Sequence, residues 1–263
     1  MAKKKTTTIC FANNKGGSGK STTCSNVGYF LAERGKKVLL IDGDMQLNLT
    51  LAFFGEEEVL DFAGGEKNLY RGIQKQEDLS EYIRATEYKN LDLIPSSTLM
   101  SSIEFELFTK WQREFILKKG LQKIKESAKY DYILIDAPPT LGGWVMNILA
   151  ASDYLIIPVE ASPWGLFGLA NMFEFLNDVK EIAPALKLAG VAITKVDGRK
   201  NYYKQTMETL GELDAYVFEN CIHLDSSVEW AQDNSKPVGK YKRSARSAKE
   251  YDLLSQEVEK VCR

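Results

Sequence analysis

One glycine-rich stretch near the N-terminus constrains the fold of this chain more than any other feature: residues 11–23 read FANNKGGSGKSTT. The apolar run before the glycines, residues 8–12, predicts a buried strand, and the apolar spacing of residues 24–34 predicts a helix. Glycines lack a Cβ, so the backbone N–H groups between them can turn inward around an anion at the helix N-terminus. A strand, a glycine loop and a helix start in this order predict a phosphate-binding loop.

The side chains at the end of this loop fit a nucleotide triphosphate. Lys20 can reach the β- and γ-phosphate oxygens, and the Ser21 hydroxyl is placed to ligate a Mg²⁺ ion that bridges the same two phosphates. The Thr22 side chain is expected to hydrogen-bond the α-phosphate. The expected nucleotide-binding residues of the loop are Lys15, Gly16, Gly17, Ser18, Gly19, Lys20, Ser21 and Thr22.

The loop departs from the standard pattern G-x-x-x-x-G-K-[ST] at its first position, where Asn14 stands in place of glycine. With Lys15 in front, the match to K-G-G-x-G-K-[ST] is complete. Two lysines so close repel each other unless a polyanion lies between them. The stretch resembles the deviant Walker A motif of the ParA/MinD family of P-loop ATPases. This resemblance implies that Lys15 reaches across a dimer interface onto the nucleotide of the partner.

A second strand ends in two carboxylates. Residues 38–41 form a continuous apolar run, and Asp42-Gly-Asp44 follows directly. Side chains two residues apart on an extended segment point the same way, so both carboxylates can face one ligand. A surface turn could also hold Asp-Gly-Asp, but the carboxyl edge of an α/β sheet is where nucleotides bind. By resemblance to the D-x-D-P-Q segment of the family, Asp42 supports the Mg²⁺ shell and Asp44 orients the attacking water, although Met45 replaces the usual proline.

A third apolar strand, residues 130–136, delivers Asp136 to its carboxyl end and is followed by A-P-P-T-L-G. It resembles a Walker B strand and the D-x-P-P-x-x-G switch segment of the same family. Mg²⁺ keeps much of its hydration shell, so Asp136 is expected to hold the ion through water. The rigid Pro138-Pro139 pair is expected to present backbone groups to the γ-phosphate. The predicted metal site is Ser21, Asp42 and Asp136, and the predicted catalytic residues are Lys15, Lys20 and Asp44.

The residues that contact the base are less well defined by sequence. Thr194-Lys-Val-Asp197 follows the predicted strand 188–193 and resembles the base-reading motif of signal-recognition GTPases, in which the aspartate accepts from guanine. In ParA-like chains the same position varies beside an adenine, so Asp197 is a candidate nucleotide contact that does not decide the base. Lys15 favours ATP. The single histidine, His223, is interpreted as a loop residue rather than a partner for the base, because no carboxylate or second histidine is expected nearby to make a proton relay or a metal site.

The middle of the chain predicts secondary structure and core packing rather than chemistry. Phe105, Phe108, Trp111 and Phe115 fall at spacings of three and four, which predicts that they pack in the core. The other expected elements are a helical stretch over 69–86, a strand at 91–94, one or two helices over 103–128, a strand at 154–158, helices over 164–179, 201–210 and 226–231, and a strand over 215–221.

A basic band near the C-terminus is the candidate DNA-binding surface. The formal net charge is −2 and the pI is about 5.7, so nucleic-acid binding requires a local patch. Residues 236–249 hold six bases and no acid, and the apolar seam of the following helix is expected to face the core. A solvated charge run is the usual explanation, but ParA-like proteins place non-specific DNA contacts here. The predicted contacts are Arg199, Lys200, Lys236, Lys240, Lys242, Arg243, Arg246 and Lys249.

Length and composition set the remaining expectations. A chain of 263 residues with 44% hydrophobic content can bury a large core, and we expect one domain over residues 1–263, with residues 1–7 as a short basic tail. The four cysteines are far apart and predict free thiols in a reducing cytoplasm. No signal peptide or membrane-spanning run is visible, and the C-terminus lacks the bulky amphipathic anchor of MinD-like proteins.

The resemblance covers nearly the whole chain and implies a small ParA-type partition ATPase without an N-terminal helix-turn-helix domain. The fold it implies is α/β, a mostly parallel twisted sheet with helices on both faces. It further implies an ATP- and Mg²⁺-dependent homodimer that binds double-stranded DNA without sequence preference. Weak ATP hydrolysis would be stimulated by a centromere-binding ParB-like adaptor, and the protein would be cytoplasmic and nucleoid-associated when ATP-bound. A MinD-like membrane regulator and a signal-recognition-type GTPase are the alternatives.

Overall fold

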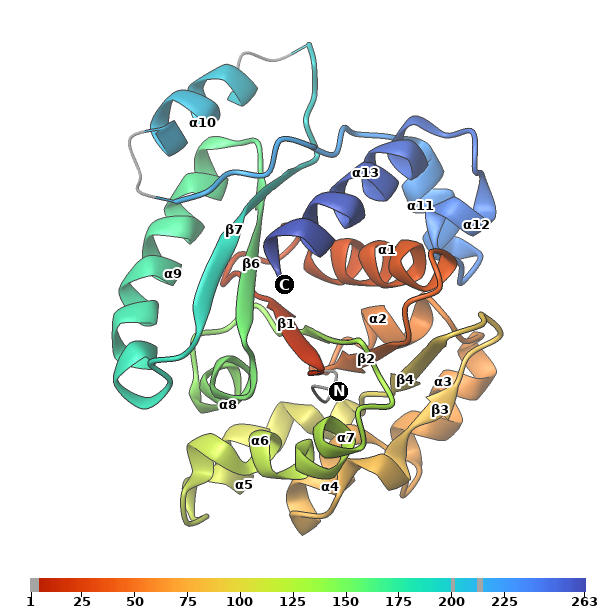
Figure 1. The fold of residues 1–263 in the computed structure, drawn as a ribbon, viewed down its shortest axis with the longest axis vertical. Helices are drawn as coiled ribbons and strands as arrows, with labels where there is room; N and C mark the ends of the chain where they lie inside the picture. The colour runs from red at the N-terminus through yellow and green to blue at the C-terminus, as the bar shows by residue number, and fades with distance from the viewer. Residues whose placement is uncertain (1–4, 200–201, 212–214) are drawn as a thin grey trace.

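A computed structural model of the chain describes residues 5–199, 202–211 and 215–263. Its centre is a seven-stranded sheet in the order β3-β4-β2-β5-β1-β6-β7 (Figure 1). Every neighbouring pair is parallel except β3 with β4. The mostly parallel sheet predicted from the sequence is therefore confirmed. The strands are β1 (Thr7–Phe11), β2 (Val38–Asp42), β3 (Arg84–Ala85), β4 (Leu91–Ile94), β5 (Tyr132–Asp136), β6 (Tyr154–Glu160) and β7 (Lys187–Thr194).

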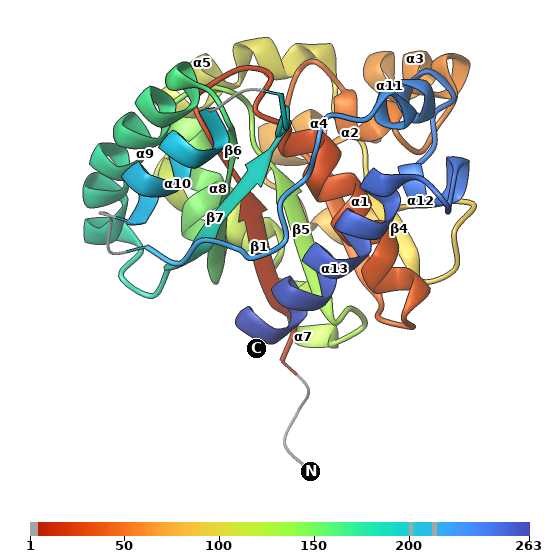
Figure 2. The ribbon, with the colours of Figure 1, turned by 90° about the horizontal axis from the view of Figure 1, so that it is seen from above.

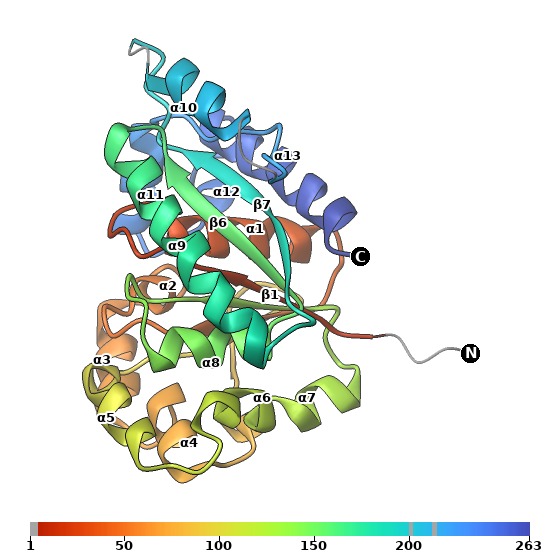
Figure 3. The ribbon, with the colours of Figure 1, turned by 90° about the vertical axis from the view of Figure 1, so that its left-hand side faces the viewer.

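Helices cover both faces of this sheet, as Figures 1 and 3 show. The larger helices of one face are α4 (Leu69–Lys75), α5 (Ile103–Phe108), α6 (Ile116–Gly120), α7 (Gln122–Ser127), α8 (Gly143–Ala151) and α9 (Pro163–Ile182). Those of the other face are α1 (Lys20–Glu33), α2 (Asn48–Leu51), α3 (Glu56–Gly64), α11 (Ser226–Asp233), α12 (Val238–Tyr241) and α13 (Arg246–Val261). The remaining helices are α10 (Tyr202–Gly211) and the 3₁₀ turns η1 (Leu79–Tyr82), η2 (Thr98–Ser102) and η3 (Arg113–Phe115).

The strands are apolar throughout because both of their faces are buried. In β2, Leu39 and Ile41 pack into the core beneath α4–α9, whereas Val38 and Leu40 pack into the core beneath α1 and α13. Side chains alternate between the faces of a strand, so a sheet with two covered faces needs an uninterrupted apolar run. This requirement explains why the central strands were visible in the sequence.

Three predicted elements are wrong in part. The helical stretch expected over 69–86 is α4, η1 and β3, because α4 ends at Gln76, which has a left-handed backbone (φ 54°). The helices expected over 103–128 are α5, η3, α6 and α7, with a second left-handed residue at Gln112. Residues 215–221 meet β7 only through an isolated bridge at Val217 and form no strand in the described part of the chain.

The expected core packing of the aromatic residues around α5 is also wrong. Phe105, Phe108 and Trp111 are 80%, 73% and 84% exposed, and Phe115 is only partly buried. On the same helix, Ile103 and Leu107 are buried and take the core-facing side. Residues 103 and 107 are four apart and share one face of the helix, whereas Phe105 is two residues from each and lies on the opposite face.

The parallel strands end at one edge and bring the carboxylates together there. Asp42 of β2 pairs in register with Asp136 of β5, and Phe11 of β1 pairs with the same residue. In Figure 2, β1 and β5 run from the N-terminal side of the molecule toward the edge where α1 begins. No helix among the described residues is long and apolar enough to cross a membrane.

Candidate nucleotide-binding site

The loop between β1 and α1 takes the conformation that an anion cradle requires. Gly17 and Gly19 have positive φ values of 74° and 85°, which only glycine adopts without strain. A Cβ at Gly19 would also lie 3.4 Å from the Thr194 hydroxyl oxygen, and that hydroxyl donates to the Ser18 carbonyl at 2.9 Å. No side chain caps the start of α1. Its first backbone N–H groups therefore remain available to a phosphate.

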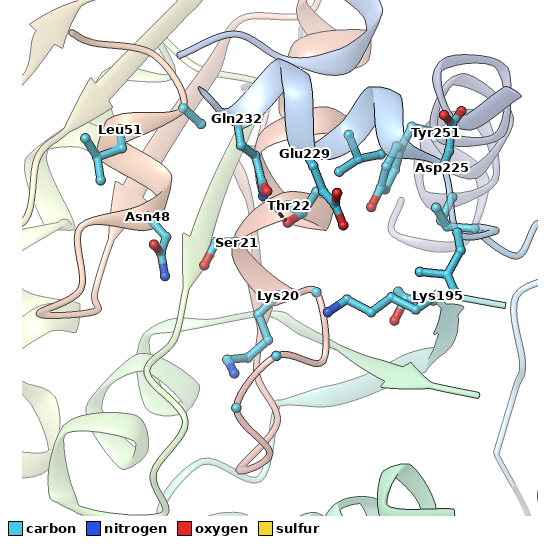
Figure 4. Close-up of a pocket in the computed structure, with 18 of the residues that line it drawn as sticks. Lys20, Ser21, Thr22, Asn48, Leu51, Lys195, Asp225, Glu229, Gln232 and Tyr251 are labelled. Carbon is cyan, nitrogen blue, oxygen red and sulfur yellow. Dashed lines mark hydrogen bonds between the residues drawn. The ribbon is translucent and has the colours of Figure 1, made fainter. Parts of the chain in front are cut away.

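A pocket of about 580 Å³ opens above this loop (Figure 4). The pocket is lined by Lys20, Ser21 and Thr22 at the start of α1 and by Glu229 and Gln232 of α11, which lie beside Thr22. The volume is that of a small-molecule or cofactor site. The predicted residues that line it are Gly16, Gly17, Gly19, Lys20, Ser21, Thr22 and Asp44.

Six of the predicted nucleotide- and metal-site residues do not line the pocket: Lys15, Ser18, Asp42, Asp136, Pro138 and Asp197. Ser18 is buried beneath the loop. Pro139 lines the pocket, whereas its neighbour Pro138 does not. The Asp197 carboxylate faces Arg199, whose backbone N–H and guanidinium donate to it at 2.9–3.1 Å.

Buried carboxylates lie beneath the phosphate end of the pocket. Asp42 accepts hydrogen bonds from the Thr50 amide and hydroxyl at 2.8 and 2.6 Å, and burial raises its pKa to about 6 despite these bonds. Burial also raises the pKa of Asp44, which accepts from the Gln46 amide. Buried carboxylates with raised pKa values in a cleft mark a candidate functional site.

Asp136 is the carboxylate that most clearly fits a cation. Its side chain is buried, and neither of its oxygens has a hydrogen bond of good geometry among the described residues. Burial, followed by the charge of Asp42, raises its pKa well above the usual value. An unpaired buried carboxylate is costly unless a ligand compensates it. The oxygen-donor set of Asp42, Asp136 and Ser21 is the kind that Mg²⁺ prefers.

Lys20 supplies the buried positive charge of the site. Its ammonium donates to the Lys15 carbonyl at 3.2 Å. Burial lowers the pKa of Lys20, and the charges of Asp136 and Asp44 oppose this shift. Lys20 therefore lies between the loop backbone and the carboxylates, where a phosphate oxygen can replace the carbonyl as its partner.

The far end of the pocket is built by residues that the sequence did not single out. It is lined by Ile222, Leu224 and Val228, with Tyr251 of α13. Gln232 joins this end to the loop, because its amide donates to the Thr22 hydroxyl at 2.9 Å. These residues lie more than two hundred positions after the loop, and no spacing pattern connects them to it.

Two further residues, Lys195 and His223, line the pocket although the sequence analysis assigned neither of them to it. Lys195, next to the motif residue Asp197, lines the pocket, and its ammonium lies 3.9 Å from the position of a Cβ on Gly17. His223 also lines the pocket and has a carboxylate beside it, because Glu250 of α13 lies 2.8 Å from His223 Nδ1 and from its backbone nitrogen. The expectation that no carboxylate lies near His223 is wrong, since tertiary packing brings α13 to it.

Comparison with known proteins places this site in a family. The family described as AAA domain matches residues 6–188. The sporulation initiation inhibitor protein Soj of Bacillus subtilis is 36% identical over 95% of this chain and 97% of its own length. The chromosome partitioning protein ParA of Myxococcus xanthus is 31% identical over 96% of this chain and 87% of its own length. The chain belongs to the ParA/Soj family of partition ATPases.

A solved structure agrees with this family membership. A putative plasmid partition protein from Borrelia burgdorferi B31, bound to AMPPNP, has a TM-score of 0.80 and 28% identity. The match covers 98% of this chain and 99% of that chain. The P-loop ATPase fold expected from the sequence is therefore confirmed over nearly the whole length.

The lysine that marks the deviant Walker A motif of this family lies away from the pocket. The Lys15 ammonium is 2.6 Å from Glu160 Oε2 and 3.1 Å from the Ser162 hydroxyl, at the junction of β6 and α9. Lys15 is not among the residues that line the pocket. In this conformation a ParA-type lysine has an intramolecular acidic partner, which it must leave in order to reach a phosphate.

The basic band occupies the surface of α12, α13 and their connection. Its members are all exposed. Arg243 pairs with Glu33 at 3.2 Å, and Arg246 pairs with Glu250 at 2.7 Å. Arg199 is exposed and paired with Asp197, and Lys200 lies outside the described residues. Among the ion pairs of the described residues, none involves Lys236, Lys240, Lys242 or Lys249.

Proposed function

We propose that this partition ATPase binds ATP with Mg²⁺ and hydrolyses it slowly to ADP and phosphate. The observation that carries the proposal is the meeting of the glycine loop with the carboxylates at one pocket of nucleotide size. ATP is favoured over GTP because Asp197, the candidate guanine reader, is bonded to Arg199 and does not line the pocket. AMPPNP in the Borrelia relative supports the same choice.

In the proposed mechanism, one group of residues binds the phosphates and the Mg²⁺ ion, and Asp44 orients the attacking water. The loop amides and Lys20 bind the β- and γ-phosphates, and Asp42, Asp136 and Ser21 hold the Mg²⁺ ion. The ion, when bound, neutralises phosphate charge. Asp44 lines the pocket and orients the attacking water. Phosphoryl transfer to water depends mainly on such positioning and charge stabilisation.

We further propose that ATP joins two copies of the chain face to face. Lys15 then exchanges Glu160 for a phosphate oxygen on the partner's nucleotide. Doubling the chain also doubles the basic band, and affinity for DNA phosphates rises with the number of cations that contact them. The ATP-bound dimer binds double-stranded DNA without sequence preference and is nucleoid-associated. A centromere-binding ParB-like adaptor stimulates hydrolysis, which releases the dimer and moves plasmid or chromosome cargo.

The test is retention of the protein on arbitrary duplex DNA with ATP, ADP, GTP or no nucleotide, at two salt concentrations. We expect retention with ATP alone, and we expect it to weaken steeply as the salt concentration rises. The Asp44→Ala protein should still bind ATP and remain on DNA, but its rate of ATP hydrolysis should fall by a factor of about 100 or more.

Three results would contradict the proposal. Equal retention with GTP would overturn the choice of ATP. Binding to anionic vesicles in place of DNA would favour the membrane regulator. Parental turnover in Asp44→Ala would remove Asp44 from the mechanism. The matched control is Asp61→Ala, which removes an exposed carboxylate of α3 that does not line the pocket.

A further inference from the structure

Three large aromatic side chains form an exposed surface at α5. We call Phe105, Phe108 and Trp111 the aromatic surface; all three are more than 70% exposed. Isolated exposed apolar residues are common, but three aromatic side chains within seven residues are not. Trp and other aromatic residues, together with Arg, are enriched at the energetic centres of protein interfaces. The composition of the aromatic surface is thus that of an interface.

Cations surround the aromatic surface, and the nearby acids have other partners. The Arg113 guanidinium lies over the Phe108 ring at 5.6 Å from its centroid, and the Lys119 ammonium is hydrogen-bonded to Gln112, next to Trp111. Glu106 accepts from the Tyr70 hydroxyl at 3.1 Å, and Glu114 pairs with Arg113. Residues 103–119 hold four bases, Lys110, Arg113, Lys118 and Lys119, and three acids, Glu104, Glu106 and Glu114, each of which has a partner within the protein. The surface therefore complements an acidic occupant.

The same helix is connected to the catalytic carboxylates by hydrogen bonds. Glu104 accepts from the backbone amides of Gly143 and Trp144 at 3.0 and 3.1 Å, and so caps the start of α8. The buried Trp144 indole donates to the Gly43 carbonyl at 2.9 Å. Gly43 lies between Asp42 and Asp44, and its own amide donates to the Asp136 carbonyl at 3.0 Å.

A second link fixes α8 to the chain that follows the aromatic surface. The Asn147 amide donates to the Arg113 carbonyl at 2.6 Å, and its oxygen accepts from the Leu117 amide at 3.3 Å. Helix α8 is thus hydrogen-bonded to α5 and to the segment after it. It meets the Asp42–Asp44 loop at Gly43, through the Trp144 indole and the Ile148 side chain.

We propose that the aromatic surface docks an acidic, apolar-rich segment of another protein, and that docking changes the position of Asp44 through Glu104 and Trp144. The effect on Asp44 rests on the proposed ATPase function, whereas docking at the aromatic surface does not. A membrane is disfavoured as the occupant because α5 has only six residues, too few for a helix that lies along a bilayer. Figure 1 shows α5 and the basic band of α12 and α13 on opposite sides of the sheet, so a docked segment leaves the band free.

The docking half is tested by selecting a displayed library of random 16-residue peptides on the intact protein. We expect enriched peptides that combine acidic with large apolar residues. Their affinity should fall about tenfold or more in the double variant Phe105→Ala, Trp111→Ala. The matched control is Leu60→Ala with Leu253→Ala, which removes two exposed apolar side chains elsewhere and should leave affinity unchanged.

Several results would overturn the docking half. They are enrichment of basic peptides, enriched peptides that bind the double variant as tightly as the parent, and tighter binding of anionic vesicles than of any peptide. Loss of ATP-dependent dimerisation in Phe105→Ala, Trp111→Ala would also overturn it, because a second copy of the chain would then be the occupant.

The relay is tested with one enriched peptide by two readouts. Amide hydrogen exchange at Gly143 and Trp144 should change on docking, whether or not ATP is hydrolysed. ATP turnover should change by about threefold or more. Glu104→Ala should keep peptide affinity and lose both responses, whereas Glu106→Ala on the same helix should keep them. Unchanged hydrogen exchange at both amides would refute the proposed coupling through Glu104 and Trp144. If the protein hydrolyses no ATP but still shows the exchange response, only the ATPase proposal is refuted.

Discussion

Asp136 is buried in a position that is unfavourable for folding without a ligand and favourable for binding a cation. Neither of its buried oxygens has a hydrogen bond of good geometry in the described structure, and its pKa is raised well above the usual value. Such a group destabilises the fold when it is ionised, and a bound cation removes this penalty. A site that is unfavourable when empty binds its ion with a free-energy gain that also stabilises the fold.

Substitutions at Lys15 and at its partner Glu160 test the proposed role of Lys15 in ATP-dependent dimerisation. The side chains of the ion pair between Lys15 and Glu160 are 23% and 32% exposed, and solvent-accessible pairs contribute about 0.2–1 kcal/mol. Glu160→Gln removes the competing charge and should strengthen ATP-dependent dimerisation by about 1.5- to 5-fold in analytical ultracentrifugation. Lys15→Gln should abolish it.

The matched control for Lys15 is Glu174→Gln, which removes an exposed carboxylate of the same helix α9 and should leave dimerisation unchanged. A Lys15→Gln protein that still dimerises with ATP would exclude the cross-interface role. Weaker dimerisation in Glu160→Gln would mean that Glu160 holds Lys15 in its active position and does not compete for it.

At the scale of elements, Asp225 joins the N-termini of two helices that close the far end of the pocket. It caps α11 by accepting from the Ser227 amide, and it accepts from the Ser247 amide and hydroxyl at the start of α13. Burial acts to raise its pKa, but these hydrogen bonds prevail and lower it to about 2. A carboxylate with a lowered pKa stabilises the fold above its unfolded pKa of about 3.9.

Asp225→Ala should therefore lower the free energy of unfolding by about 1–2 kcal/mol at pH 7. The difference from the parent should shrink as the pH falls from about 4 toward 2, because the parental carboxylate then takes up its proton. Urea denaturation at several pH values measures both effects. Asp233→Ala at the other end of α11 is the control, and an Asp225→Ala difference that does not vary with pH would assign the loss to packing instead.

At the scale of the whole molecule, the sheet separates the proposed DNA surface from the helices of α4–α8. Lys240→Glu with Lys249→Glu should weaken ATP-dependent DNA retention about tenfold or more and reduce its dependence on salt. ATP binding should be unchanged, because neither residue lines the pocket. Nitrocellulose filter binding across a salt series measures this.

The control for the Lys240, Lys249 variant makes the same change of charge on the other side of the sheet. Lys67→Glu with Lys123→Glu replaces two exposed lysines near α4 and α7. If it weakens DNA retention as strongly, overall charge rather than the basic band governs binding.

The sequence alone determined the elements whose constraints are local. Phosphate loops need glycine at positive φ, and strands buried on both faces need continuous apolar runs, so β1, β2, β5 and the loop after β1 could be predicted. The strand-end acids could be placed at one edge because parallel strands finish together. The family resemblance added the roles that spacing alone does not give.

Tertiary structure decided every feature that depends on which distant residues meet. Helix α13 brings Glu250 to His223, and α11 closes the pocket over Thr22, across separations that leave no periodic signal. The aromatic residues of α5 have core-like spacing, yet only packing determines which side of a short helix faces inward, and Ile103 and Leu107 take that side. Hydrophobic burial is non-directional, so the apolar pattern fixes which residues can be buried, and the geometry of the assembled layers selects those that are.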